Sequence, residues 1–224
     1  MADNFLERQY NDYLAQKAAK DKAKTAKWRQ QLKAYKEKLA QQKPAEPQNL
    51  LADGVVKLRA LEPTDLDLLY EWENDTRLWA VGSTLAPFSR AALWKFLQES
   101  TGDIYASHEV HFVVETIDST PVGMLDLFGF DAHNSRCEIG VHIIPSHRRK
   151  GYALRALEIV KRYVFMHLGV NQLYATIPAF HAASVALFDR ANFSEQHLMP
   201  QWVRQGGEMV DAVIAQCLKT NYTN

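Results

Sequence analysis

Cysteine, net charge and long apolar runs are scarce in this chain of 224 residues, and each scarcity excludes a class of protein. The two cysteines, Cys137 and Cys217, lie far apart in apolar runs, which excludes a disulfide framework or a cysteine metal cluster. No stretch approaches the ~18 apolar residues that span a bilayer, and the start, MADNFLERQY, lacks the apolar core of a signal peptide. We therefore expect buried free thiols and a soluble cytoplasmic protein without a membrane partner.

The balance of 26 basic and 26 acidic side chains excludes a uniformly basic nucleic-acid binder, but it hides a division along the chain. Residues 1–45 hold eleven Lys and Arg against five Asp and Glu, a net charge of +6, and residues 46–224 carry −6. Such asymmetry is typical of an arm joined to a differently charged domain. The organisation that we predict is a basic helical arm (1–42), a proline-containing linker (43–54) and one domain (55–224).

The arm contains no glycine or proline over residues 4–42 and is rich in good helix formers. Trp28, Leu32, Tyr35 and Leu39 follow at helical spacing and form an apolar stripe. Two uses remain open. The stripe can pack on its own domain or make a homo-oligomer, whereas the interleaved cations and aromatic rings would suit RNA or a ribosomal surface.

Beyond residue 55 the pattern alternates between strands and helices, which predicts an α/β or α+β fold. The spacing indicates a helix over 65–73 capped by Thr64, and others over 90–99 capped by Ser89, 152–168 and 181–191. Seven strands are expected, with hairpins on both sides of the central strand region. Their ranges are 55–61, 109–117, 121–130, 136–144, 171–177, 194–204 and 208–218.

The most informative stretch is HIIPSHRRKGYALRALEIV, in which a strand ends, the chain turns and a helix begins. Free backbone N–H groups and the positive end of the helix dipole meet at this turn, beside three consecutive cations, Arg148, Arg149 and Lys150. Gly151 and Ala153 leave room for a ligand. The turn can therefore hold a pyrophosphate, or it can be a solvated basic turn, since short turns of this kind are common.

The spacing Arg148-x-x-Gly151-x-Ala153 resembles the acetyl-CoA signature of the GNAT N-acetyltransferase superfamily, [QR]-x-x-G-x-[GA]. The resemblance extends from Val56 to about Leu218, and within the superfamily this stretch resembles the branch of spermidine/spermine and ribosomal-protein N-terminal acetyltransferases. It implies a mixed, mostly antiparallel seven-stranded sheet flanked by about four helices, and acetyl-CoA as co-substrate.

The resemblance also implies where acetyl-CoA lies. The strands at 136–144 and 171–177 should splay apart, with pantetheine paired to the backbone of Val141 and Ile143 between them. A bulge at Gly140 and Val141 would direct an amide to the thioester carbonyl. The remaining implied contacts come from the turn and from the helix over 181–191: Arg148, Arg149, Lys150, Gly151, Tyr152, Ala153, Leu154, His181, Ser184 and Phe188.

Glu138 is the candidate catalytic base, because strand alternation puts it on one face with Gly140 and His142. The alternative is a carboxylate that forms an ion pair with Arg136 or faces solvent. In the family motif that ends in Leu-Tyr, this chain has Leu187-Phe188. Phe188 cannot donate the proton that the family's tyrosine supplies, so another group or water serves as the acid, the thiolate leaves unassisted, or activity is weak or absent.

Three carboxylates belong to segments that face the acceptor in the resembled enzymes, and they are candidate substrate ligands: Glu73, Asp126 and Asp131. They would suit a polycationic amine, although ordinary surface charge on an acidic domain is the alternative. The histidines show no ligand spacing, so no metal is expected.

The function expected from the resemblance is transfer of an acetyl group from acetyl-CoA to a primary amine, either a polyamine-like small molecule or a protein N-terminus. The alternative is a weak or inactive GNAT domain that binds CoA and acts as an interaction or regulatory module through its helical arm.

Overall fold

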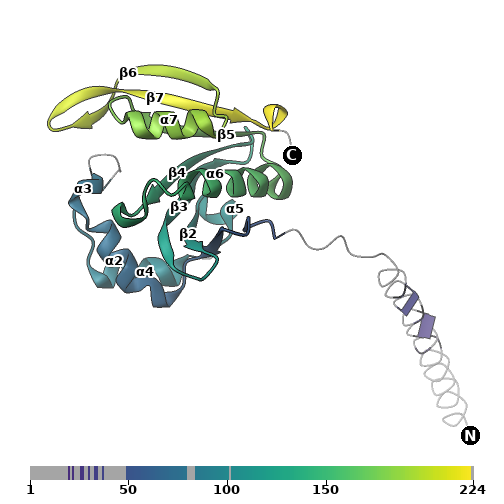
Figure 1. The fold of residues 1–224 in the computed structure, drawn as a ribbon. Coiled ribbons are helices and arrows are strands. Elements are labelled where there is room, and N and C mark those ends of the chain that lie inside the picture. The colour runs from purple at the N-terminus through teal and green to yellow at the C-terminus, as the bar shows by residue number, and fades with distance from the viewer. Residues whose placement is uncertain are drawn as a thin grey trace, which may run out of the picture. The chain divides into compact units, whose positions relative to one another are not determined.

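The computed structural model describes residues 49–79, 84–100 and 102–222, the side chain of residue 195 excepted, and eight separate positions nearer the N-terminus. Contacts divide the chain into two compact units, Met1–Gln48 and Asn49–Asn224 (Figure 1). In the first unit, the eight described residues are helical and exposed, as the arm's composition predicts: Lys20, Lys22, Ala26, Lys27, Gln30, Lys33, Ala34 and Glu37. The apolar stripe of the arm lies outside the described residues.

The second unit is built on one seven-stranded sheet in the order β1-β2-β3-β4-β5-β7-β6. The β4–β5 pair is parallel and every other neighbouring pair is antiparallel, which confirms the predicted mixed sheet. The strands are β1 (Val56–Ala60), β2 (Val110–Thr116), β3 (Pro121–Asp131), β4 (Arg136–Ile143), β5 (Gln172–Pro178), β6 (Glu195–Gln205) and β7 (Glu208–Leu218).

Six α-helices are present among the described residues rather than the four predicted: α2 (Leu66–Glu73), α3 (Thr76–Trp79), α4 (Arg90–Glu99), α5 (Ile104–Ser107), α6 (Tyr152–Arg162) and α7 (Ala182–Arg190). The two unexpected helices, α3 and α5, are single turns of four residues, too short to show apolar periodicity. The helix predicted over 152–168 is present as α6 followed by a π-helical turn, Tyr163–Leu168. Gly169 ends it.

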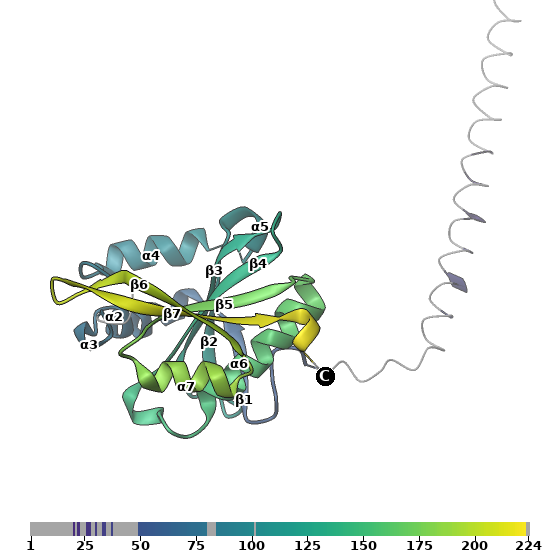
Figure 2. The same ribbon diagram turned by 90° about the horizontal axis from the view of Figure 1, so that it is seen from above.

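Helices cover both faces of the sheet (Figure 2). The main core lies between the sheet and the pair α6 and α7, and it includes both free cysteines, which are buried as expected. A smaller core forms where α2 and α4 meet β3: Leu69, Trp72, Leu93, Leu97 and Met124. Alternate residues of each central strand therefore face different helix pairs.

Local capping agrees with the sequence at α4 but not at α2. The Ser89 hydroxyl accepts a hydrogen bond from the amide of Ala92 at 3.1 Å, as predicted. Thr64 is wrong as the cap of α2, because it lies inside a short 3-10 turn, Pro63–Asp65. Asp65 stands at the N-cap position of α2, but its side chain makes no capping hydrogen bond to that helix. Its carboxylate instead accepts a hydrogen bond from the amide of Glu62 at 2.8 Å and binds the guanidinium of Arg59 at 2.6 Å.

Residues 49–54, the second half of the predicted linker, pack onto the domain. The guanidinium of Arg162 donates to the carbonyls of Asn49, Leu50 and Ala52, the last at 2.8 Å. Asp53 forms an ion pair with Arg155 of α6, also at 2.8 Å. The domain therefore begins, in its contacts, directly after Gln48.

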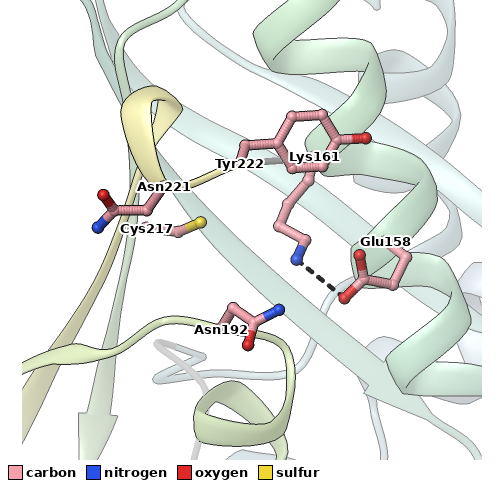
Figure 3. Close-up of a pocket in the computed structure, with 6 residues that line it drawn as sticks. All are labelled: Glu158, Lys161, Asn192, Cys217, Asn221 and Tyr222. Atoms are coloured by element: carbon pink, nitrogen blue, oxygen red, sulfur yellow. Dashed lines mark ion pairs between the residues drawn. The ribbon is translucent and has the colours of Figure 1, made fainter. Parts of the chain in front are cut away.

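A buried lysine joins α6 to the end of α7. Lys161 is 1% exposed, donates to the carbonyl of Ala191 at 2.7 Å and pairs with Glu158 at 2.8 Å. Lys161 and Glu158 line a cavity of about 40 Å³ beside Cys217 and Tyr222 (Figure 3). Because a cation at the C-terminal end of a helix offsets the dipole of its carbonyl groups, Lys161 is a structural support.

Within the part of the chain that the structure describes, no helix combines the length and hydropathy needed to cross a bilayer. The cytoplasmic location stays a prediction.

Candidate active site

The two central parallel strands separate after a short contact. β4 pairs with β5 at three positions, from Arg136–Gln172 to Glu138–Tyr174, and both strands continue without further pairing with each other. The predicted splaying of these strands is confirmed. A wedge-shaped gap between two strands leaves backbone groups of β4 for a ligand that can act as a strand.

The hydrogen-bond alternation of β4 shows which backbone groups face this gap. The amide of Ile144 donates to the carbonyl of Val122, so the hydrogen-bonded pairs with β3 fall at every second residue back from Ile144. Val141 and Ile143 therefore direct their N–H and C=O groups away from β3, to the side that β5 leaves. The Ile143 carbonyl accepts from Nε of Arg148 at 2.8 Å.

The expected bulge at Gly140 and Val141 is wrong. The β3–β4 register runs without a shift from Gly123–Ile143 to Phe128–Glu138. The irregularity lies beyond that point, between Phe128 and Asp131, where Gly129 adopts φ +57°. Glycine reaches this left-handed conformation at little cost, so the extra residue is accommodated there.

The turn from β4 into α6 exposes the start of the helix. Arg149 has φ +62°, and Gly151 stands at the N-cap with φ +82°. Because Gly151 has no side chain, the first amides of α6, from Tyr152 to Leu154, receive no cap from it. A Cβ built on Gly151 would meet no atom within 4 Å, so the space in front of these amides is open. Arg148, Arg149 and Lys150 are exposed around it.

Residues of α7 were expected near the same gap. His181 is half-buried at the N-cap of α7, and its side chain makes no capping hydrogen bond. Ser184 is half-buried in the first turn, and its amide donates to the His181 carbonyl. Phe188 is buried in the main core with its ring edge-on to Phe193 at 5.0 Å. Contact of these side chains with a cofactor stays a prediction.

The face of the sheet turned to α2 and α4 carries the polar groups, and we call His111, Asp126, Glu138, Gly140 and His142 the polar face. Strand pairing arranges these residues in rows across the sheet, and the first row is His111, Asp126 and Gly140, because Asp126 pairs with the other two. Glu138 lies between Phe128 and Tyr174 in the next row, and His142 opposite Met124 in the row beyond. Glu138 is half-buried. The pKa of Tyr174 is raised first by burial of Tyr174 itself, and then by the charge of Glu138 and the hydrogen bond to it.

Carboxylates gather at Asp126. Its Oδ1 lies 2.8 Å from Nδ1 of His111, and Oε1 of Glu109 lies 3.6 Å from Nε2 of the same ring. Burial, and then the charge of Asp126, raise the pKa of Glu73 at the end of α2. Glu73 and Asp126, two of the predicted substrate ligands, are therefore close enough to interact.

Asp131, the third predicted ligand, lies apart from these groups. It is five residues further along β3, where its carboxylate accepts from the backbone and side-chain nitrogens of Asn134 and pairs with Arg136 at 3.3 Å. It organises the β3–β4 turn.

Three polar residues of this region were not predicted as site residues: His111, His142 and Tyr174. Nε2 of His142 is buried without a hydrogen-bond partner, and burial followed by the charge of Arg148 lowers the pKa of His142 to about 4. The signal for His142 was present, since strand alternation already put it on the face of Glu138. Among the described residues, no group of three His, Cys, Asp or Glu side chains could hold a metal ion.

Comparison with known proteins agrees with this geometry. The family model described as "Acetyltransferase (GNAT) domain" matches residues 56–194, from the start of β1 to the residue before β6. The N-acetyltransferase p20 of Bacillus licheniformis is 23% identical over 74% of this chain and 93% of its own. Spermidine N(1)-acetyltransferase of Escherichia coli is 27% identical over 67% of this chain and 80% of its own.

Solved structures show the same fold. The spermidine N-acetyltransferase of Vibrio cholerae, in complex with CoA and spermine, superposes with a TM-score of 0.70 at 22% identity and covers 77% of this chain and 100% of its own. The predicted acyltransferase class and the acetyl-CoA co-substrate follow from the family match, which covers more than half of the chain. This protein belongs to the GNAT acetyltransferase family.

Proposed function

We propose that this enzyme acetylates a primary amine that carries additional positive charge, a polyamine-like small molecule. The observation that carries the proposal is the partly open carboxylate of Asp126, which lies opposite Gly140 on the polar face, with Glu73 at the end of α2 close enough for the two charges to interact. Paired carboxylates at a half-buried site attract a cation and disfavour a neutral or acidic acceptor. The names of the Escherichia coli and Vibrio cholerae relatives support a polyamine over a protein N-terminus.

In this proposal acetyl-CoA enters from the gap between β4 and β5. Pantetheine pairs with the backbone of Val141 and Ile143, which point into the gap, and the pyrophosphate accepts hydrogen bonds from the amides of Arg149 to Leu154. The exposed cations of the β4–α6 turn add charge-assisted contacts. The family resemblance predicts further contacts to acetyl-CoA from His181, Ser184 and Phe188 of α7.

The amine and the acetyl group meet over Gly140, where a side chain would narrow the approach. An alkylammonium has no lone pair, so it first gives a proton to the carboxylate of Glu138. The nitrogen then attacks the acetyl carbonyl, a C–N bond forms and the C–S bond breaks. The nitrogen's second proton then passes to water, and the same water delivers a proton to the leaving thiolate, because Phe188 has no proton to give.

An acceptor panel tests this function. We expect the full chain to release thiol from acetyl-CoA with spermidine at a kcat/KM at least about tenfold above that for butylamine, since a second cationic nitrogen pairs with the remaining carboxylate. Peptides with free N-termini are the competing class. A preference for a peptide, or for butylamine over spermidine, would contradict a polyamine-like acceptor, and mass spectrometry of the product identifies the acetylated nitrogen.

A further inference from the structure

His111 stands behind the carboxylate to which the proposed function assigns the acceptor cation. Nδ1 of the ring lies 2.8 Å from Oδ1 of Asp126 across the β2–β3 pair. The His111 side chain is 16% exposed and that of Asp126 34%, so the carboxylate is the more open of the two. With one oxygen bound to the imidazole N–H, the second oxygen of Asp126 remains for an acceptor nitrogen.

Among the described residues, the other sides of the imidazole meet an aromatic ring and leave Nε2 without a hydrogen bond. Phe96 of α4 packs edge-on against the ring, with centroids 5.0 Å apart. Nε2 is buried and has no hydrogen-bond partner in the described structure, with Glu109 at 3.6 Å. The ring therefore keeps one strong polar contact, to Asp126, and that contact determines the orientation of both groups.

We propose that His111 is a positioning residue for the acceptor amine, which orients Asp126 through Nδ1 and serves as the internal counter-ion of the carboxylates while no amine is bound. This inference rests on the proposed function, because it assumes a cationic acceptor at Asp126. It adds a residue that has no part in binding acetyl-CoA and no direct contact with the reacting atoms.

The charges around the ring give the counter-ion its pH dependence. The groups that act on it are Asp126 from β3, Glu109 from the segment before β2 and Glu73 from α2, whereas α4 contributes the aromatic ring of Phe96. Burial lowers the pKa of His111, but the hydrogen bond and charge of Asp126, followed by Glu109, outweigh it and raise the pKa above its ordinary value.

An ammonium bound at Asp126 would reverse part of that increase, because a second cation disfavours the imidazolium. Binding of the amine therefore releases a proton from His111. By linkage, the acceptor binds more weakly as the pH falls below the pKa of His111 in the empty site, where the amine must displace that proton. Acetyl-CoA, bound at the β4–β5 gap, does not share this dependence.

Two substitutions separate orientation from charge. In His111→Asn a side-chain N–H takes the place of the Nδ1–H, but nothing titrates, whereas His111→Leu removes both properties. We expect the spermidine KM of the wild type to rise severalfold from pH 8 to pH 6, and that of His111→Asn to stay constant. In His111→Leu we expect the spermidine KM to be about tenfold above that of the wild type at pH 8 and to stay constant with pH. The change in kcat should be smaller, and the acetyl-CoA affinity should be unchanged.

A purely structural histidine would give another pattern. It would lower the melting temperature of both variants without changing the acceptor KM of the folded enzyme. The proposal is overturned if folded His111→Leu keeps the wild-type KM, or if His111→Asn keeps the wild-type pH dependence.

A direct titration separates this proposal from the proposed function. NMR of the His111 imidazole in the full chain should give a pKa above that of free histidine, which falls on adding spermidine and falls in Asp126→Asn. If the enzyme acetylates spermidine but adding spermidine leaves the pKa of His111 unchanged, the role proposed for His111 is wrong. If spermidine shifts His111 but is not acetylated, the proposed function is wrong and the counter-ion stands.

Discussion

At the scale of single residues, Glu138 carries the proposed proton transfer. It is half-buried on the polar face, beside Gly140 and next to Tyr174. Glu138→Gln keeps the shape and removes the proton acceptor, so we expect turnover to fall ~10²–10⁴-fold with CoA affinity unchanged. Steady-state kinetics and calorimetric titration of CoA measure the two quantities.

Tyr174→Phe is the matched control for Glu138→Gln. It removes the hydroxyl beside Glu138 but leaves the carboxylate, so it should lower turnover much less than Glu138→Gln. Turnover of Glu138→Gln within twofold of wild type would show that Glu138 has a structural role.

Strand alternation and the family resemblance predict Glu138, and the resemblance predicts Glu73 and Asp126, but the partnership of His111 with Asp126 depends on strand register. β2 pairs Glu115 with Pro121, and the register then shifts by one residue, so that Val114 pairs with Gly123. Without that bulge His111 would lie opposite Leu125 instead of Asp126. Because a one-residue slip exchanges the two faces of a strand, no count along the chain could have found this pair.

At the scale of secondary-structure elements, the β4–α6 turn carries the prediction for cofactor binding. A leucine at position 151 would occupy the open space before the amides of α6 and would carry a side chain at φ +82°. We expect Gly151→Leu to lose at least about tenfold in acetyl-CoA affinity, or ~1.4 kcal/mol, through lost amide contacts. Calorimetric titration measures it.

Gly169→Leu controls for backbone strain. Gly169 also has a positive φ, +71°, and open space around its Cβ position, but it ends the helix at the opposite end from the turn. A similar loss of stability in both variants, with acetyl-CoA affinity lost only in Gly151→Leu, would support binding of the pyrophosphate at the β4–α6 turn. Unchanged affinity in folded Gly151→Leu would end the assignment of this turn to CoA.

Long elements follow from the sequence because periodicity accumulates over their length, as in α6, where the buried positions recur at helical spacing. Local exceptions do not. The single turns α3 and α5 give no periodic signal, and the bulge expected at Gly140 lies instead where Gly129 takes a left-handed conformation. A family pattern cannot specify which glycine of a hairpin accepts the extra residue.

At the scale of the whole molecule, the proposed function assigns the two substrates to two different sides of the domain of residues 49–224. The side of α6 and α7 provides the apolar core and the amides at the start of α6, and the side of α2 and α4 provides the polar face. The gap between β4 and β5 connects them. The role of the basic arm in self-association or nucleic-acid contact stays a prediction. The dodecamer in a solved structure of the Vibrio cholerae relative is a property of that protein.

The proposed function assigns the acceptor amine to the polar face and Glu73, and acetyl-CoA to the β4–β5 gap, and one kinetic comparison distinguishes the two sites. Asp126→Asn combined with Glu73→Gln removes both charges, and Asp131→Asn removes a carboxylate of the same strand that lies outside the cluster. We predict that the double variant raises the KM for spermidine at least about tenfold, ~1.4 kcal/mol, with unchanged acetyl-CoA affinity, and that Asp131→Asn changes neither. An unchanged spermidine KM in the folded double variant, or an increase in Asp131→Asn alone, would contradict the account.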